Sequence, residues 1–199
     1  MKLFGEDGSV LEQWEGLRLR KVETLSRQTP WPEALLGPYL ERSLEELIPQ
    51  SKISVALLKG DSETALRLLL GRDVLIRHRS DGKPEVDGAL NVSTAHSGEL
   101  TLAVAGSCGC DLETVAARPW RELLGPERFA LAQQLTEELN TAGTRVWTAL
   151  ECLKKAGASD APLVLKESRS DHWALFASGA RTIATYLANG HLVAAILAE

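Results

Sequence analysis

The chain lacks most of the features that mark secreted, membrane-bound or disulfide-stabilised proteins. Its 199 residues include three cysteines, Cys108, Cys110 and Cys152, an odd number without the spacing of a disulfide framework. This favours a reducing cytoplasm, and we expect all three to be small core residues. No apolar run is long enough to span a bilayer, and the N-terminus does not resemble a signal peptide.

Runs of positive charge are also missing. No basic block exceeds a few residues, and the formal net charge is −5. Both properties argue against a surface for nucleic acids or anionic membranes. Hydrophobic residues, by contrast, make up 44% of the chain, which is enough for a substantial core in one large domain or two small ones.

The N-terminal part of the sequence predicts a β-hairpin within residues 1–30. The turn residues 6–9 separate two apolar segments, and residues 16–22 alternate polar and apolar as a half-buried strand does. Pro32 suits the first turn of a helix that reaches about Leu47.

Strand-like and helix-like segments then follow in mixed order. We expect strands at 53–58, 74–76, 90–93, 100–105, around 110, and at 163–166, 173–176, 181–187 and 191–197. We expect helices at 61–70, 120–124, 126–139 and 144–156. Asn189-Gly190 is typical of a hairpin turn between the last two strands. The order predicts an α+β fold in two similar halves, residues 31–107 and 108–199.

Two acidic segments carry the chemical information. Gly109-Cys110-Asp111-Leu112-Glu113 places two carboxylates two positions apart, so both point to one face of a strand. Trp147, Glu151 and Lys155 are each four positions apart and form one stripe on a helix. Three carboxylates and an ammonium suit a hard divalent cation that holds a phosphate ester. The two segments together therefore indicate phosphoryl-group chemistry.

Each segment alone has a simpler interpretation. An Asp-x-Glu pair on a strand is usually a solvated face, and a Glu followed four residues later by Lys is usually a surface pair worth roughly 0.2–0.5 kcal/mol. Trp147 is better explained by core packing than by catalysis. It is the order of the two segments that favours a joint site.

Four short motifs, in their order along the chain, resemble the Sfp-type 4′-phosphopantetheinyl transferases. The similarity runs from about residue 53 to the C-terminus, and the last two motifs are specific in combination. The motifs are Gly82-Lys83-Pro84-Glu85, Ala95-His96-Ser97-Gly98, Gly109-x-Asp111-x-Glu113 and Trp147-Thr148-x-x-Glu151-x-x-x-Lys155.

The resemblance implies a specific reaction and architecture. Such enzymes transfer the phosphopantetheine arm of coenzyme A to a serine of an acyl carrier protein and release 3′,5′-ADP. They commonly act as monomers, with two α+β halves related by an approximate two-fold axis and coenzyme A in the cleft between them. By this resemblance, Asp111, Glu113 and Glu151 would hold Mg²⁺, and Glu151 would take the serine proton directly or through water.

Three further roles follow from the same resemblance. Lys155 would contact the pyrophosphate of coenzyme A, and His96 would bind one of its phosphates. Lys83 would reach the 3′-phosphate of the nucleotide. Without the motifs, a lone histidine after a strand or a lysine in a turn would be an ordinary residue.

The chain departs from the family pattern at two positions and in one segment. Many relatives have lysine where this chain has Leu150, and serine where it has Ala95, which removes one hydroxyl contact to the cofactor. A basic residue is expected near the start of the helix at 61–70, where Ser62-Glu63-Thr64 stands. These departures leave open a catalytically silent module of the same fold that docks a carrier. A metal-dependent phosphohydrolase is a third hypothesis, although its usual extra His or Asp ligands are not evident.

The N-terminal segment carries a second resemblance. Residues 8–20 resemble the closing strands of polyketide synthase dehydratase domains, and residues 31–41 resemble the linker that follows them. Iterative synthases of the enediyne type place such a dehydratase before a C-terminal transferase. The resemblance implies that residues 1–30 end a preceding dehydratase-like domain, and that the carrier is part of the same synthase.

Overall fold

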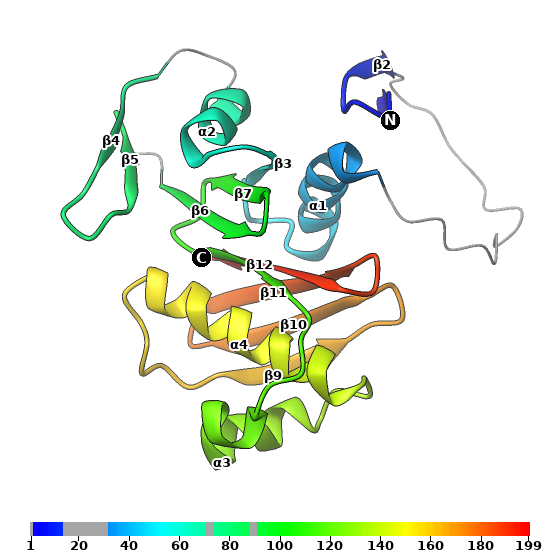
Figure 1. Cartoon of the computed structure of the whole chain (residues 1–199), viewed down its shortest axis with the longest axis vertical. Helices are drawn as coiled ribbons and strands as arrows, with labels where there is room; N and C mark the ends of the chain where they lie inside the picture. Colours follow the sequence, from blue (N-terminus) through cyan, green and yellow to red (C-terminus); the bar gives the residue numbers. More distant parts are fainter. Residues whose placement is uncertain (1, 14–31, 71–73, 88–90) are drawn as a thin grey trace, which may run out of the picture.

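The computed structural model describes residues 2–13, 32–70, 74–87 and 91–199 and shows an α+β fold (Figure 1). All strand pairings in this part of the chain are antiparallel. Before the second acidic segment, the elements are β1 (Lys2–Phe4), β2 (Val10–Gln13), α1 (Glu33–Leu47), β3 (Ser54–Lys59), α2 (Ser62–Leu70), β4 (Ile76–His78), β5 (Pro84–Val86), β6 (Val92–Ser97), β7 (Leu100–Ala105), β8 (Cys110–Thr114) and α3 (Trp120–Ala132). They are followed by α4 (Leu139–Lys155), β9 (Val164–Ser168), β10 (Trp173–Ser178), β11 (Arg181–Ala188) and β12 (Leu192–Ala198).

A three-stranded sheet in the order β3-β7-β6 forms the first half, with helices on both faces. Helix α1 buries Leu36, Leu40 and Leu44, which are spaced four apart and each 1% exposed. They pack in the same cluster as alternate residues of β3 and β7, whereas α2 packs on the opposite face through Leu66 against Ala103. Side chains alternate between the two faces along each strand, so α1 and α2 pack against different residues of the same sheet.

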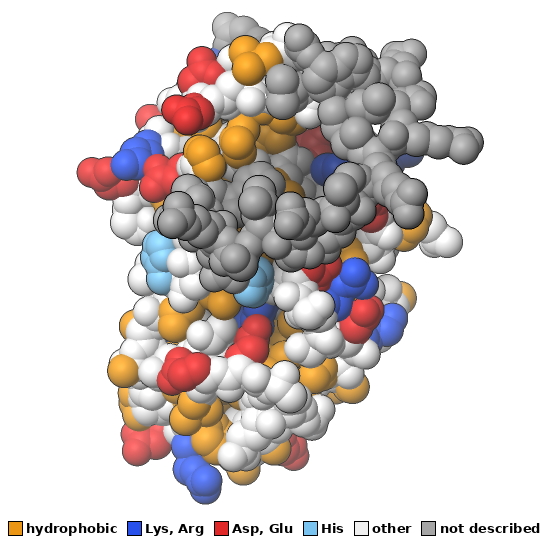
Figure 2. All heavy atoms as spheres, turned by 90° about the vertical axis from the view of Figure 1, so that its right-hand side faces the viewer, with side chains coloured by type: hydrophobic (Ala, Val, Ile, Leu, Met, Phe, Trp, Pro, Cys, Tyr) orange, Lys and Arg blue, Asp and Glu red, His pale blue; other side chains and the backbone are white. Residues whose placement is uncertain are grey.

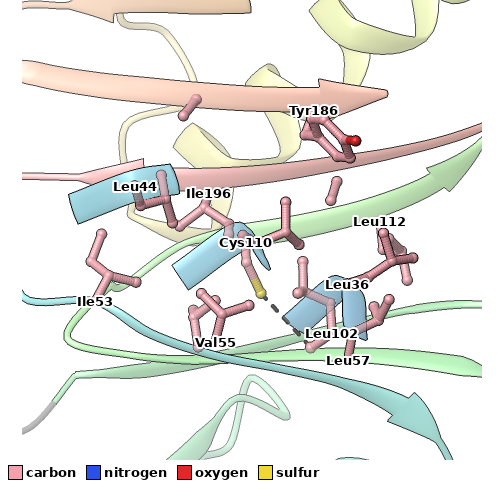
Figure 3. Close-up of a cluster of buried hydrophobic side chains, with 14 of the residues drawn as sticks. Leu36, Leu44, Ile53, Val55, Leu57, Leu102, Cys110, Leu112, Tyr186 and Ile196 are labelled. Atoms are coloured by element: carbon pink, nitrogen blue, oxygen red, sulfur yellow. Dashed lines mark hydrogen bonds between the residues drawn. The ribbon is translucent and has the colours of Figure 1, made fainter. Parts of the chain in front are cut away.

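A five-stranded sheet in the order β8-β12-β11-β10-β9 forms the second half. One face packs against α4, and the other contributes to the cluster around α1. Figure 3 shows this shared core, in which Val55 and Leu102 of the first sheet lie near Cys110, Leu112 and Ile196 of the second. The two halves are therefore joined by one continuous hydrophobic cluster.

The two sheets share a connectivity. In the first, β3 leads to α2 and then to the hairpin β6–β7, whose second strand pairs with β3. In the second, β8 leads to α4 and ends in the hairpin β11–β12, whose second strand pairs with β8. Two similar halves related by an approximate two-fold axis stay a prediction.

Helix α4 is joined to the second sheet by hydrogen bonds from the buried guanidinium of Arg145. Arg145 is fully buried and donates to both carboxylate oxygens of Glu137, at 2.6 and 2.7 Å. The same guanidinium donates to the carbonyls of Thr185 in β11 and His172 before β10, at 3.0 and 2.9 Å. This planar group therefore connects α4 to two neighbouring segments.

Most of the expected elements are present, but several boundaries differ: β4 lies at 76–78 instead of 74–76, and β6 extends to Ser97. Strand β5 was not among the expected strands. The expected break near residue 125 appears as a kink, with Gly125 at φ 70° inside α3. The helix expected at 126–139 ends at Ala132, and α4 begins at Leu139 instead of residue 144. The reason is a cap, because the Glu138 side chain accepts hydrogen bonds from the backbone N–H groups of Asn140 and Thr141.

The structure also describes part of the expected N-terminal hairpin. Strands β1 and β2 pair as predicted, and the strand expected at 16–22 lies outside the described residues. A Cβ added at Gly8 would lie 3.0 Å from the Ala34 carbonyl oxygen, so the hairpin turn lies against the start of α1.

Two expectations from the composition concern the distribution of charge on the surface and the presence of membrane-spanning helices. On the face in Figure 2, acidic and basic side chains of the described residues alternate with apolar ones. Of the helices formed by the described residues, none combines the length and the apolar character needed to cross a lipid bilayer.

Candidate functional site

The first acidic segment lies on β8, where a glycine allows α4 to approach closely. A Cβ added at Gly109 would lie 2.4 Å from the backbone carbonyl oxygen of Cys152, so there is no room for a side chain. Cys152 precedes the last turn of α4, which carries Lys155, and follows Glu151 directly. Gly109 therefore allows the two acidic segments to meet.

The edge of β8 also borders the first sheet. Strand β6 packs beside β8, and the Cys110 N–H donates to Ser93 Oγ at 3.2 Å. Farther along, the hydroxyls of Ser97 and Thr114 are 2.9 Å apart. We call this junction of β6 and β8 the seam.

Lys155 reaches into the seam and pairs with Asp111. Its ammonium donates to Asp111 Oδ1 at 3.1 Å, to the Cys110 carbonyl at 2.8 Å and to the Thr94 carbonyl at 3.3 Å. The Asp111 side chain is 12% exposed and that of Lys155 26%. The second carboxylate oxygen, Asp111 Oδ2, is buried and has no hydrogen-bond partner among the described residues. An unpartnered buried carboxylate oxygen is suited to a cation.

The pKa shifts of this pair reflect burial and the opposite charge of each partner. Burial raises the pKa of the Asp111 carboxyl, Lys155 opposes the rise, and the charges of Glu113 and Glu151 add to it. Burial lowers the pKa of Lys155, but its carboxylate partner outweighs burial and the net shift is upward. The Glu113 and Glu151 carboxylates thus make the smallest contributions to the shift of Asp111.

The two glutamates are each paired with a neighbouring cation. Arg118 Nη2 donates to Glu113 Oε2 at 2.9 Å, and Lys154 Nζ lies 3.2 Å from both carboxylate oxygens of Glu151. Within the part of the chain that the structure describes, no three His, Cys, Asp or Glu side chains are grouped so that they could hold a metal ion. A shared metal would require these carboxylates to turn from their basic partners toward one another.

His96 lies in a separate polar group between β6 and α2. Its Nε2 is 2.8 Å from Ser62 Oγ, and its Nδ1 is 2.8 Å from Thr101 Oγ1. Ser62 also donates to Thr94 Oγ1 at 3.0 Å. Because the Thr94 carbonyl accepts from Lys155, Thr94 connects this group to the seam.

Lys83 extends from the turn between β4 and β5 to the end of α4. Its Nζ donates to the Lys155 carbonyl at 2.8 Å and lies 3.5 Å from Asp81 Oδ2. This contact joins the β4–β5 hairpin of the first half to the helix of the second. Lys83 therefore lies beside the end of α4 that carries Lys155.

The positions that depart from the family pattern are accounted for by packing. Ala95 is 4% exposed and belongs to the shared core, so a serine there would bury its hydroxyl. Leu150 packs against the hydrophobic cluster beneath α4. Ser62 places its hydroxyl next to His96, at the helix start where a basic residue was expected.

Sequence reasoning missed the cations that pair with the glutamates. Arg118 is five residues after Glu113 in a segment with no regular structure, so no periodicity relates the two. Lys154 is three residues after Glu151 on one helix, a spacing that does signal contact. The expectation for the cysteines is met at Cys110 and Cys152, which are buried free thiols, while Cys108 is partly exposed.

A scan of the chain against protein-family models finds no matching family, and a search of the curated proteins finds no significant match. The assignment to the transferases therefore stays a prediction based on the quoted motifs.

Proposed function

We propose that the chain is a Mg²⁺-dependent 4′-phosphopantetheinyl transferase that acts on a serine of an acyl carrier protein or carrier domain. The observation that carries this proposal is the Asp111–Lys155 pair in the seam, with two further carboxylates in the same two segments. One oxygen of Asp111 is buried and has no hydrogen-bond partner in the described part of the chain. An acid-rich site with a neighbouring ammonium suits a ligand that combines a divalent cation with phosphates.

The chemistry of these oxygen donors suits magnesium once the carboxylates turn from their basic partners toward one another. Mg²⁺ prefers oxygen ligands and is usually held by carboxylates together with substrate phosphates, so Asp111, Glu113 and Glu151 would hold it. When bound, the ion would offset negative charge on the pyrophosphate and on the leaving 3′,5′-ADP.

The protein groups would orient the substrate and accept a proton. Lys155 and Lys83, which contact each other through the Lys155 carbonyl, would bind phosphates of coenzyme A, and His96 would bind another. The carrier serine oxygen forms a bond to the phosphorus that bears pantetheine. The bond from that phosphorus to the bridging oxygen breaks, its electron pair leaves with 3′,5′-ADP, and Glu151 takes the serine proton. Positioning and electrostatics would supply most of the catalysis.

The proposal includes the setting of the reaction. We infer a cytoplasmic enzyme, monomeric as an isolated domain, whose carrier belongs to the same polyketide synthase. Neither nucleic acid nor membrane is a proposed partner.

One observation favours the alternative of a silent docking module. All three hydrogens of the Lys155 ammonium are used within the protein, and each carboxylate already has a basic partner. In a silent module these pairs would be permanent, whereas in the enzyme they would rearrange when the substrate binds.

Incubation with coenzyme A, Mg²⁺ and an apo acyl carrier protein distinguishes these functions. Intact-mass spectrometry should show a gain of one phosphopantetheine on the carrier, and Asp111→Asn should abolish the gain because a cation ligand is lost. An unchanged carrier that still binds the chain would favour the docking module, and release of free phosphate would favour a hydrolase.

A further inference from the structure

Each of the three carboxylates of the site is paired with one cation of the same chain. The pairs are Asp111–Lys155, Glu113–Arg118 and Glu151–Lys154. Their charges balance, so a divalent ion that entered alone would leave an excess of positive charge. A diphosphate group brings negative charge that offsets this excess, and the charges therefore favour a cation and a diphosphate that bind together.

Lys154 is the most exposed of the three cations. Its side chain is 66% exposed, compared with 32% for Arg118 and 26% for Lys155. Its ammonium donates to both carboxylate oxygens of Glu151 at 3.2 Å, and its third hydrogen has no partner among the described residues. An exposed pair at this helical spacing contributes little stability, so it can be exchanged at low cost.

The other two cations are held more firmly. Lys155 donates to Asp111 and to two backbone carbonyls. The guanidinium of Arg118 lies 5.7 Å from the ring centroid of the buried Trp120, which is within the range of a cation–π contact. Lys154 is therefore the cation that leaves its carboxylate most readily.

The place of Lys154 on α4 suits a residue that contacts the ligand. It is three residues after Glu151 and directly before Lys155, in the last turn of the helix. Leu150 stands where many members of the transferase family have lysine, and it packs into the hydrophobic cluster beneath α4. Lys154 is about one turn, or about 5.4 Å, farther along the same side of the helix, a distance within reach of a flexible lysine stem.

We propose that Lys154 is a ligand-binding residue that exchanges partners: it releases Glu151 to the divalent cation and binds the diphosphate of coenzyme A. This inference rests on the proposed function. It agrees with the rearrangement that a shared metal requires, because Glu151 becomes available to the ion when the ammonium leaves it. The freed ammonium is a mobile point charge with three donors, which is a common way to bind phosphate.

Two simpler roles of Lys154 give different results. If it is only a counter-ion of Glu151, its removal tightens cation binding and does not weaken the binding of coenzyme A. If it only stabilises the C-terminal end of α4 through the helix dipole, its removal lowers Tm and changes neither affinity. Tighter cation binding together with weaker binding of coenzyme A identifies the exchange.

The test compares two titrations of Lys154→Gln with those of the unaltered chain. Electron paramagnetic resonance of the free ion measures Mn²⁺ binding without coenzyme A, and calorimetry measures coenzyme A binding at saturating Mn²⁺. In the variant, Mn²⁺ should bind about two- to fivefold more tightly, and coenzyme A about tenfold more weakly. The loss should be equal for 3′-dephospho-coenzyme A, which keeps the diphosphate.

Lys166→Gln is the matched control, because it removes the same charge from another exposed lysine. Lys166 lies on β9, at the opposite edge of the five-stranded sheet from β8. Its removal should change neither affinity. Lys154→Arg keeps a positive charge and should weaken coenzyme A binding less than Lys154→Gln does.

The outcomes separate this inference from the proposed function. Coenzyme A affinity in Lys154→Gln that is unchanged or tighter would overturn the inference and leave the proposed function standing. The same holds for a loss confined to the ligand with a 3′-phosphate, or for Mn²⁺ binding that is not tightened. If Mn²⁺ had no effect on coenzyme A binding to the unaltered chain, both would be overturned. Should Lys154→Gln fail to fold, Lys154→Met is judged by the same titrations.

Discussion

Removal of Lys155 should destabilise the metal-free protein in a way that depends on Asp111. Lys155→Met deletes an ammonium that bonds to Asp111 Oδ1 and to two backbone carbonyls, and leaves a mostly buried carboxylate without a cation. Breaking one side of a fully buried pair costs about 3–5 kcal/mol. Because the two side chains keep 12% and 26% exposure, we expect a smaller loss of about 2–3 kcal/mol in the free energy of unfolding. For a chain of this length, that corresponds to a fall in Tm of roughly 4–12 °C.

A double-mutant cycle identifies the cause. Asp111→Asn removes the charge that Lys155→Met leaves unpaired, so the double variant should recover about 1–2 kcal/mol relative to additivity. The assay is urea unfolding followed by circular dichroism, in the presence of EDTA so that no divalent ion contributes.

The loss should also depend on pH. Burial already raises the pKa of Asp111 in the intact protein, and removal of Lys155 should raise it further. The folded variant then binds a proton more tightly than the unfolded chain. The loss in the free energy of unfolding of Lys155→Met should therefore be smallest below about pH 4, which is the ordinary pKa of an Asp carboxyl. It should grow as the pH rises toward neutrality. A Lys155→Met protein as stable as the unaltered chain at neutral pH, or a double variant without recovery, would refute the reasoning.

Three further predictions use other parts of the structure. Calorimetry should show that Lys83→Ala weakens the binding of coenzyme A and weakens the binding of 3′-dephospho-coenzyme A much less. Equal losses of affinity for the two ligands would show that Lys83 does not contact the 3′-phosphate. Gly109→Ala should lower the free energy of unfolding by about 1–3 kcal/mol, because its Cβ would overlap the Cys152 carbonyl; an unchanged Tm would mean that α4 can move away at no cost. Cys108 should react with a thiol reagent in the folded protein, whereas Cys110 and Cys152 should react only after unfolding. Burial raises the pKa of the Cys110 thiol to about 12. Equal reaction rates of the three thiols in the folded protein would contradict the packing.

The sequence was sufficient for the elements whose periodicity is strong. Pro32 at the first turn predicted α1, which extends to Leu47 as expected, and Asn189-Gly190 predicted the last hairpin, where both residues have positive φ. It failed at the start of α4, because the polar first turn reads as a loop. That turn is helical through a side-chain cap from Glu138 and through packing of Trp120 on Gly143, neither of which has a periodic signal.

The proximity of Asp111 and Lys155 could be predicted from the sequence, but the geometry around them could not. The spacing of Asp111 and Lys155 within their motifs indicated that both belong to one site, and the structure brings them into contact. No sequence pattern indicated that the Thr94 carbonyl would accept a hydrogen bond from Lys155, because that contact depends on how β6 packs beside β8. The pairing of Glu113 with Arg118 likewise depends on the path of an irregular segment between a strand and a helix.

The central claim is that three carboxylates converge on one divalent ion beside the pyrophosphate of coenzyme A. Anomalous diffraction from a crystal of the chain with Mn²⁺ and coenzyme A tests it directly. We predict one manganese peak in contact with the carboxylate oxygens of Asp111, Glu113 and Glu151, with the Lys155 ammonium turned toward the diphosphate. A peak at another place, or coenzyme A bound with these carboxylates still paired to their basic neighbours, would contradict the claim.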